Sequence, residues 1–177
     1  MRCPSAQRTV RSIAALEVST MGLSIPAFHV SDGSQVKGGG MVLITSRKAG
    51  GFAGTFTIKI AAGFNPGVDL YPTGGFELKV DMNDGVNGGY KSTSIELINS
   101  HGKINPTVFL TGRCSGGSRE RKGLRYWLMI ANNQTREAKE GGTPDIVGFA
   151  IHDRAGARIA YGTGPLQPPG RIEVKAE

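Results

Sequence analysis

The feature that most constrains this chain is a strict alternation of apolar and polar residues in short segments. In GFELKVDM (residues 75–82), every second residue from Phe76 to Met82 is apolar, and the residues between them are charged. Residues 52–60 repeat this pattern, with Phe56, Ile58 and Ile60 in one register. Because successive side chains of a β-strand point to opposite faces, a period of two predicts a strand with one buried face.

Nine such segments follow one another along the chain, centred near residues 43, 56, 79, 95, 109, 128, 149, 159 and 173. Clusters of Gly, Asn and Asp separate them, and turn residues predict hairpins at 83–85, 87–89, 100–102 and 154–156. The chain holds 27 glycines and 9 prolines, well above the usual share of about 12% for these two residues. We therefore predict an all-β fold, either an antiparallel β-sandwich or a closed meander barrel of about nine strands.

The length of 177 residues fits one domain. We divide it into a short N-terminal extension (residues 1–35) and a single β domain (residues 36–177), because the strand pattern begins only after Pro26. Glu17 interrupts the only apolar stretch near the N-terminus, so residues 1–20 make a poor signal peptide. No apolar run reaches the ~18–20 residues of a membrane-spanning helix, so we expect no transmembrane segment.

The formal net charge of +7 favours anionic partners. Five basic residues and one acid, Glu120, lie between positions 113 and 125, which predicts a basic loop that could bind an anionic ligand. The basic residues are Arg113, Arg119, Arg121, Lys122 and Arg125. Because they gather in one loop and are not interleaved with aromatic residues along a strand surface, the pattern disfavours nucleic acid. An anionic polysaccharide or a surface protein is the partner that this cluster favours, and a loop that is merely solvated is the simpler alternative.

No motif in the sequence predicts catalysis. There is no nucleophile elbow, the three histidines share no metal-ligand spacing, and no cofactor fingerprint is present. We therefore predict no catalytic residue, no metal site and no cofactor. On this basis the sequence favours a protein that is not an enzyme, without deciding the point. A closed barrel could still bring polar residues together in its interior. The residues that we select for such a site are Asp81, Glu96, Tyr126, His152 and Tyr161.

Adjacent aromatic residues in the segment RYWLMIA, Tyr126 and Trp127, must point to opposite faces of a strand. We expect Trp127 in the core, and an outward Trp127 beside Arg125 as the alternative, where it could stack on a glycan. The two cysteines, Cys3 and Cys114, are far apart in sequence and could form one disulfide or remain two thiols.

The ordered set of segments resembles the post-COAP domain family, found at the ends of bacterial secreted and cell-surface proteins. The likeness covers about residues 36–175 and lies in the order of the strands and in the positions of the glycines between them. The matching pieces are residues 38–40 (GGG), 54–59 (GTFTIK), 92–98 (STSIELI), 109–114 (FLTGRC), 142–151 (GTPDIVGFAI) and 170–174 (GRIEV). The resemblance implies an extracellular, all-β accessory domain, secreted or on the cell surface, and it carries no catalytic residues.

Three functions follow as hypotheses. The first is a non-enzymatic β-rich binding or structural module that acts through surface contacts. The second is a small β-barrel enzyme or small-ligand carrier with an interior polar site. The third is a self-assembling filament or coat subunit, in which residues 1–35 pair with the sheet edge of a neighbouring copy.

Overall fold

The computed structural model describes residues 33–45, 52–65, 67–102, 104–117, 121–133 and 143–176. These ranges contain nine β-strands and no helix, which confirms the predicted all-β class and strand number. The strands are β1 (Gln35–Thr45), β2 (Phe52–Gly63), β3 (Thr73–Met82), β4 (Asn87–His101), β5 (Thr107–Gly116), β6 (Arg121–Ala131), β7 (Ile146–His152), β8 (Arg158–Pro165) and β9 (Arg171–Lys175).

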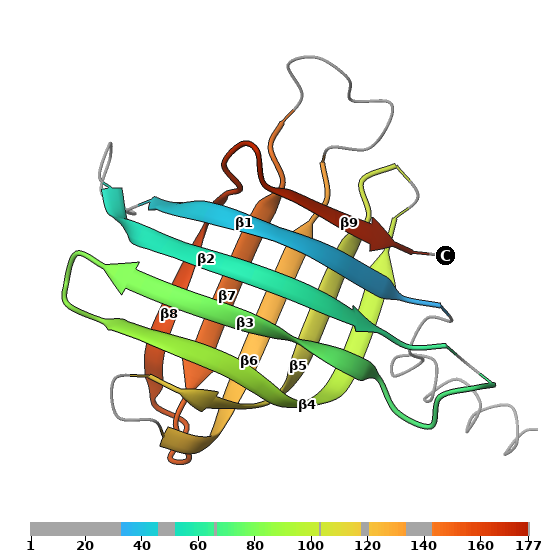
Figure 1. The fold of residues 1–177 in the computed structure, drawn as a ribbon, viewed down its shortest axis with the longest axis horizontal. Helices are drawn as coiled ribbons and strands as arrows, with labels where there is room; N and C mark the ends of the chain where they lie inside the picture. Colours follow the sequence, from blue (N-terminus) through green and yellow to red (C-terminus); the bar gives the residue numbers. More distant parts are fainter. Residues whose placement is uncertain are drawn as a thin grey trace, which may run out of the picture.

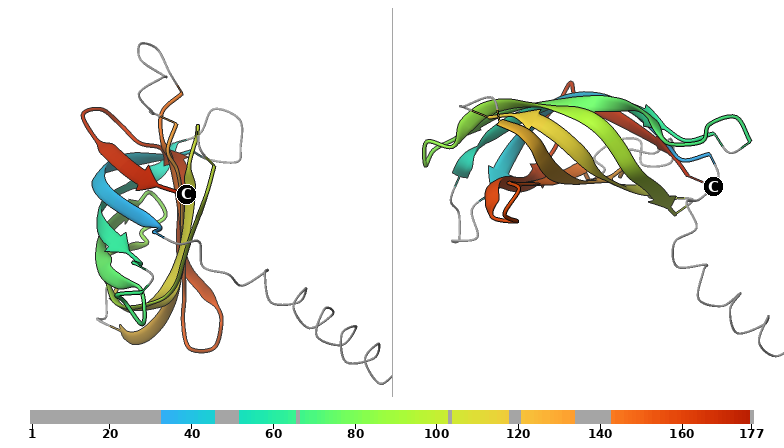
Figure 2. Two further views of the ribbon diagram at one scale, coloured as in Figure 1. Left: turned by 90° about the vertical axis from the view of Figure 1, so that its right-hand side faces the viewer. Right: turned by 90° about the horizontal axis from the view of Figure 1, so that it is seen from below.

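All nine strands belong to one antiparallel sheet in the order β8-β7-β6-β5-β4-β3-β2-β1-β9. The sheet curls on itself into two layers whose strands cross at a steep angle (Figure 1, Figure 2). One layer holds β9, β1, β2 and β3, and the other holds β5 to β8, while the long strand β4 passes from the first to the second. Register shifts between Ser92 and Ser94 and between Ile95 and Leu97 lie in β4, and such irregularities let a strand bend around a corner.

The sheet curls until β1, which lies next to the end strand β9, meets the segment that follows the other end strand, β8, along what we call the β1–β8 seam. An isolated β-bridge joins Val42 to Leu166, and the Gln167 N–H donates to the Met41 carbonyl oxygen at 2.8 Å. The backbones approach so closely here that a side chain at Gly164 would overlap the carbonyl oxygen of Leu43. The molecule is therefore a single curled, barrel-like sheet and not two separate sheets.

Apolar side chains from both layers fill the interior. Phe56 on β2 meets Phe149 on β7 edge to face, with ring centroids 4.8 Å apart. Phe76 on β3 meets Tyr126 on β6 in the same way at 4.7 Å. Such pairs stabilise beyond the area that they bury, so they tie the two layers together at two points.

Two local predictions were wrong, both within β4. Residues 87–89 lie inside the strand, not in a hairpin turn, and the turn that precedes them is closed by Asp84, whose Oδ1 accepts the Val86 N–H at 3.1 Å. Ile95 and Leu97 share a parity, which predicts that both face the core. The alternation changes phase at the second register shift, however, so Ile98 is fully buried in place of Leu97.

Candidate binding surface

The predicted interior polar site is not assembled. Asp81, Glu96 and Tyr161 are exposed, His152 is half-buried at the end of β7, and of the five residues only Tyr126 is fully buried. The reason is strand parity, because each of the exposed three directly follows a buried apolar residue on its strand and therefore points outward. The interior that these residues would have lined is packed with apolar side chains instead.

Tyr126 and Cys114 are buried without forming a reactive group. The Tyr126 hydroxyl donates to the Ser94 carbonyl oxygen at 3.3 Å, and burial raises the pKa of this phenol far above its ordinary value. Burial also raises the pKa of the Cys114 thiol to about 11. Cys114 is a free thiol here, and Cys3 lies outside the described residues, so the possible disulfide stays a prediction.

Trp127 points outward, with 58% of its surface exposed, so the expected core position was wrong and the alternative was right. Tyr126 takes the inward position, and the adjacent residue must then face solvent. The register places Trp127 beside Thr111 on β5 and beside Ala150 on β7, which in turn lies beside Tyr161 on β8. Trp127 and Tyr161 are thus two strands apart in one row, about 10 Å at ordinary strand spacing.

Together with Phe109 on β5, these two rings form what we call the aromatic face. Phe109, Trp127 and Tyr161 are 43%, 58% and 52% exposed on the outer side of β5 to β8. Ala150 on β7 is the only residue between Trp127 and Tyr161 in their row, so no large side chain separates these two rings, and Met129 lies opposite Phe109. Gathered exposed aromatics on a soluble scaffold mark an interaction surface, since single exposed apolar residues are common but clustered ones are not. From the sequence, Trp127 was selected as a possible stacking residue and Tyr161 for an interior site. Phe109 was not selected, although its outward parity was readable.

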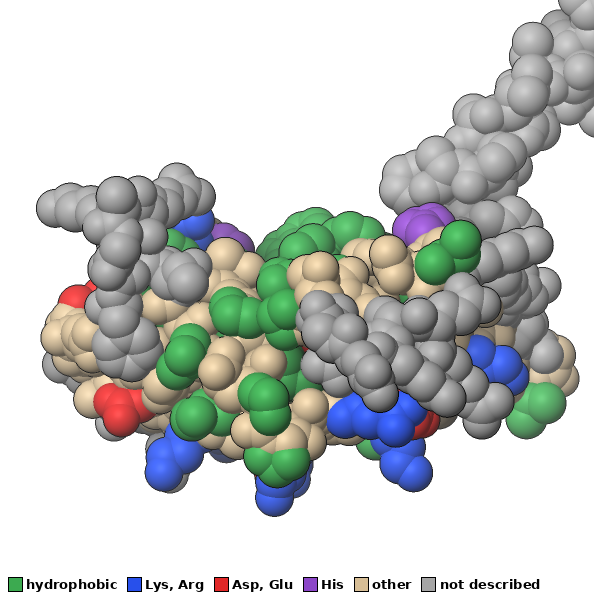
Figure 3. Space-filling view, turned by 90° about the horizontal axis from the view of Figure 1, so that it is seen from above, with side chains coloured by type: hydrophobic (Ala, Val, Ile, Leu, Met, Phe, Trp, Pro, Cys, Tyr) green, Lys and Arg blue, Asp and Glu red, His purple; other side chains and the backbone are tan. Residues whose placement is uncertain are grey.

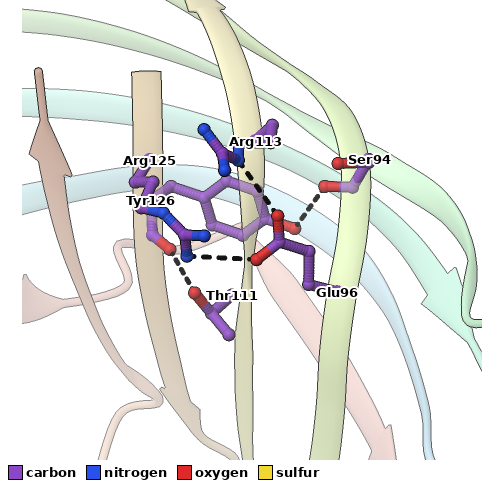
Figure 4. A network of polar contacts seen from close by, with 6 residues as sticks. All are labelled: Ser94, Glu96, Thr111, Arg113, Arg125 and Tyr126. Carbon is purple, nitrogen blue, oxygen red and sulfur yellow. Dashed lines mark hydrogen bonds and ion pairs between the residues drawn. The ribbon is translucent and has the colours of Figure 1, made fainter. Parts of the chain in front are cut away.

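A row of charged residues borders the aromatic face, two residues from Trp127 along the strand and on the same side of the sheet. Arg113 on β5 lies opposite Arg125 on β6, and Arg125 lies opposite His152 on β7. Glu96, on the bent part of β4, binds both arginines: Arg113 Nε donates to Oε1 at 3.0 Å and Arg125 Nη1 donates to Oε2 at 3.1 Å (Figure 4). Each guanidinium has five donors, so most of its donors stay available to a ligand.

Arg158 continues this row on β8, opposite His152. Its guanidinium carbon lies 3.9 Å from the centre of the Tyr161 ring, within the range of a cation–π contact. Three arginines and one glutamate therefore border the aromatic face, giving it a net positive edge. We call Arg113, Arg125 and Arg158 the arginine row.

The basic cluster seen in sequence does not form one loop, so that prediction was wrong in its geometry. Arg113 and Arg125 lie on strands beside the aromatic face, whereas Arg121 and Lys122 begin β6, where the β5–β6 hairpin reaches the other layer. Arg119 lies outside the described residues. Because β5 and β6 pair across this stretch, basic residues that are close in sequence lie on different sides of the molecule.

Lys122 lines an open groove of about 990 Å³ on the outer side of β2 to β4. Three lysines from successive strands, Lys59, Lys79 and Lys91, line the same groove with the acids Glu77 and Asp81. Lys and Arg side chains project along the side of the β1–β3 layer, the lower edge of Figure 3. The alternation in the sequence places Lys59 and Lys79 on the outward side of their strands, but it does not show that they come together, because they lie on different strands.

Comparisons with models of protein families, with curated proteins and with solved structures found no match to this chain. The resemblance to the post-COAP family therefore stays a prediction. Within the part of the chain that the structure describes, no helix is long and apolar enough to cross a membrane. The same described residues contain no group of three or more His, Cys, Asp or Glu side chains placed to hold a metal ion.

Proposed function

We propose that this domain is a non-enzymatic binding module that holds an acidic polysaccharide on its aromatic face. The observation that carries the proposal is the alignment of Trp127 and Tyr161 in one row, with the arginine row alongside. Both rows stand on paired strands, and such a scaffold keeps a binding constellation in place at little entropic cost.

The chemistry of the face suits sugars that carry acidic groups. The ring faces of sugars present C–H groups that pack against aromatic rings, and their hydroxyl and carboxylate oxygens accept hydrogen bonds from guanidinium groups at the edge. Here the arginine row lies beside the stacking surface itself. Arg125 is two residues from Trp127 along β6, and the Arg158 guanidinium lies over the Tyr161 ring.

Trp127 is the only tryptophan of the chain, so its fluorescence reports directly on this face. We expect titration with polygalacturonate or heparin to change its emission. A neutral polysaccharide of similar length should cause a smaller change, because it cannot engage the arginines. Adding salt should weaken the response to the acidic polymers.

The paired substitution Trp127→Ala and Tyr161→Ala should reduce retention on a heparin or polygalacturonate gel. Tyr71→Ala is the matched control, because Tyr71 is 75% exposed but lies in the β2–β3 connection, outside the aromatic face. Equal retention of the unsubstituted protein, the double variant and the Tyr71→Ala control, together with unchanged Trp127 emission at saturating polymer, would refute the proposal.

We also propose an extracellular or cell-surface location, which the post-COAP resemblance supports and which fits a polysaccharide ligand. The enzyme or carrier alternative has less support, because the polar residues selected for it do not converge. The filament alternative depends on residues 1–35, of which residues 1–32 lie outside the described ranges, and it stays a prediction.

A further inference from the structure

We propose that the groove on the outer side of β2 to β4 is a second, electrostatic site for a linear acidic polysaccharide. It differs from the aromatic face in its place, its charge carriers and its shape. The groove occupies about 990 Å³ and is lined by three strands, β2, β3 and β4, and by the β5–β6 hairpin, so it is a concave surface and not a single protruding loop.

The charges of the groove do not cancel. Four lysines face two acids, and one lysine is already engaged, because Lys91 Nζ lies 2.9 Å from Glu77 Oε1. Lys59 lies opposite Glu77 on the other side and acts on it through space. Glu77 therefore has cations on both flanks, while Lys79 and Lys122 form no ion pair with any described residue.

Glycines open the floor of this groove. Gly88, Gly89, Gly116 and Gly117 line it, and a Cβ at Gly89 would meet no atom within 4 Å. Gly89 lies opposite Lys79 in the register. A ligand can therefore approach the backbone directly beside a lysine ammonium group, which holds three donors and no acceptor.

The lining favours a polysaccharide over a single-stranded nucleic acid. Among the described residues that line the groove, Tyr90 is the only aromatic one, and it is 5% exposed, so nucleic-acid bases would have no ring to stack on. A sulfated or uronic acid chain needs no stacking, and it presents anions at regular intervals. Resting on the proposed function, two such sites on opposite layers would let one domain hold two chains.

The test measures binding of a short heparin-derived oligosaccharide to the full chain. Calorimetry gives the affinity, and Trp127 emission reports on the aromatic face. The double variant Lys79→Gln/Lys122→Gln removes two groove cations. We expect roughly tenfold weaker binding of one oligosaccharide by calorimetry, from two lost ionic contacts. The Trp127 response should stay the same, because the tryptophan lies on the other layer.

Lys37→Gln/Lys175→Gln is the matched control, since both lysines are exposed on the same layer but outside the groove. An equal loss of affinity in this control would mean that diffuse net charge binds the oligosaccharide, and would overturn the site. Tighter binding of single-stranded DNA than of heparin at this groove would overturn the choice of ligand. If Trp127 emission never responds but the groove variant still loses calorimetric affinity, the proposed function fails and the groove site stands.

Discussion

Each outer face of the molecule holds one acid with two basic neighbours, but their order across the strands differs. On the β5–β8 side, Glu96 on β4 stands at the end of the row, and its carboxylate binds Arg113 on β5 and Arg125 on β6. On the β2–β4 side, Glu77 on β3 lies between Lys59 on β2 and Lys91 on β4. Opposite charges on neighbouring strands stabilise a sheet, so such an arrangement by itself does not mark a face as a binding site.

The two faces differ in the groups that surround each acid. Glu96 holds two planar guanidinium groups at 3.0 and 3.1 Å, beside a row of exposed rings. Glu77 accepts from one flexible lysine at 2.9 Å, and the groove around it is floored by glycine. Guanidinium groups present fixed, planar donors, whereas ammonium groups act as mobile point charges. We therefore expect specificity from the first face and salt-sensitive affinity from the second.

The largest expected effect separates two neighbouring residues, Tyr126 and Trp127. Tyr126→Ala should lower the free energy of unfolding by about 3–5 kcal/mol, because it empties a buried site against Phe76. Trp127→Ala should lower it by less than about 1 kcal/mol, because this ring is mostly exposed. Urea unfolding of both variants measures the contrast. Similar losses would mean that the aromatic face is structural and not a free surface.

The second effect compares two glycines, one at the β1–β8 seam and one in the groove. Gly164→Ala should destabilise by about 1–3 kcal/mol, because its Cβ would overlap the Leu43 carbonyl oxygen and force the backbone apart. Gly89→Ala should change stability by about 0.5 kcal/mol or less, since its Cβ meets only open space. Thermal unfolding of the two single variants tests this. A stable Gly164→Ala protein would show that the seam is looser than described.

A third prediction removes each central acid in turn. Glu96→Gln should strengthen the Trp127 response to heparin a few-fold at low salt, because it adds one unit of net positive charge beside the rings. Glu77→Gln should leave that response unchanged, because it lies on the other layer. Fluorescence titration compares them. If the Trp127 response to heparin increases equally in both variants, long-range charge governs binding and the two faces do not act separately.

The smallest effect concerns the ionisation of Glu77. The hydrogen bond and the charge of Lys91, with a smaller contribution from Lys59, hold the pKa of this carboxyl below its usual value of 4.5. A lowered folded-state pKa means that the contribution to stability is present above pH 4.5 and disappears as the pH falls through the lowered value. Side-chain NMR titration should show a rise in the pKa of Glu77 in Lys91→Gln and a smaller rise in Lys59→Gln. The opposite order would contradict the geometry.

Most of the fold could be predicted from local pattern, and most of the candidate site could not. All nine strands lie where alternation predicts them, because one-sided burial imposes a period of two. Trp127 and Tyr161 were identifiable one by one, but their alignment in a single row depends on the registers of β6, β7 and β8. Register is a pairing between strands, and no single segment contains it.

The amino-acid order alone determined which residues share a face of a strand, because side-chain parity is a property of one strand. Tertiary packing decided which of the two faces is buried, as it did in placing Tyr126 inside and Trp127 outside. The curl of the sheet determined which outward residues meet, since it sends β1 to β3 and β5 to β8 to opposite layers. The register shifts in β4 allow that bend, and they also exchanged Leu97 for Ile98 in the core. The position of a bulge depends on the packing of both layers and cannot be read from one segment. The basic run from Arg113 to Arg125 was likewise divided between two faces by the curl of the sheet.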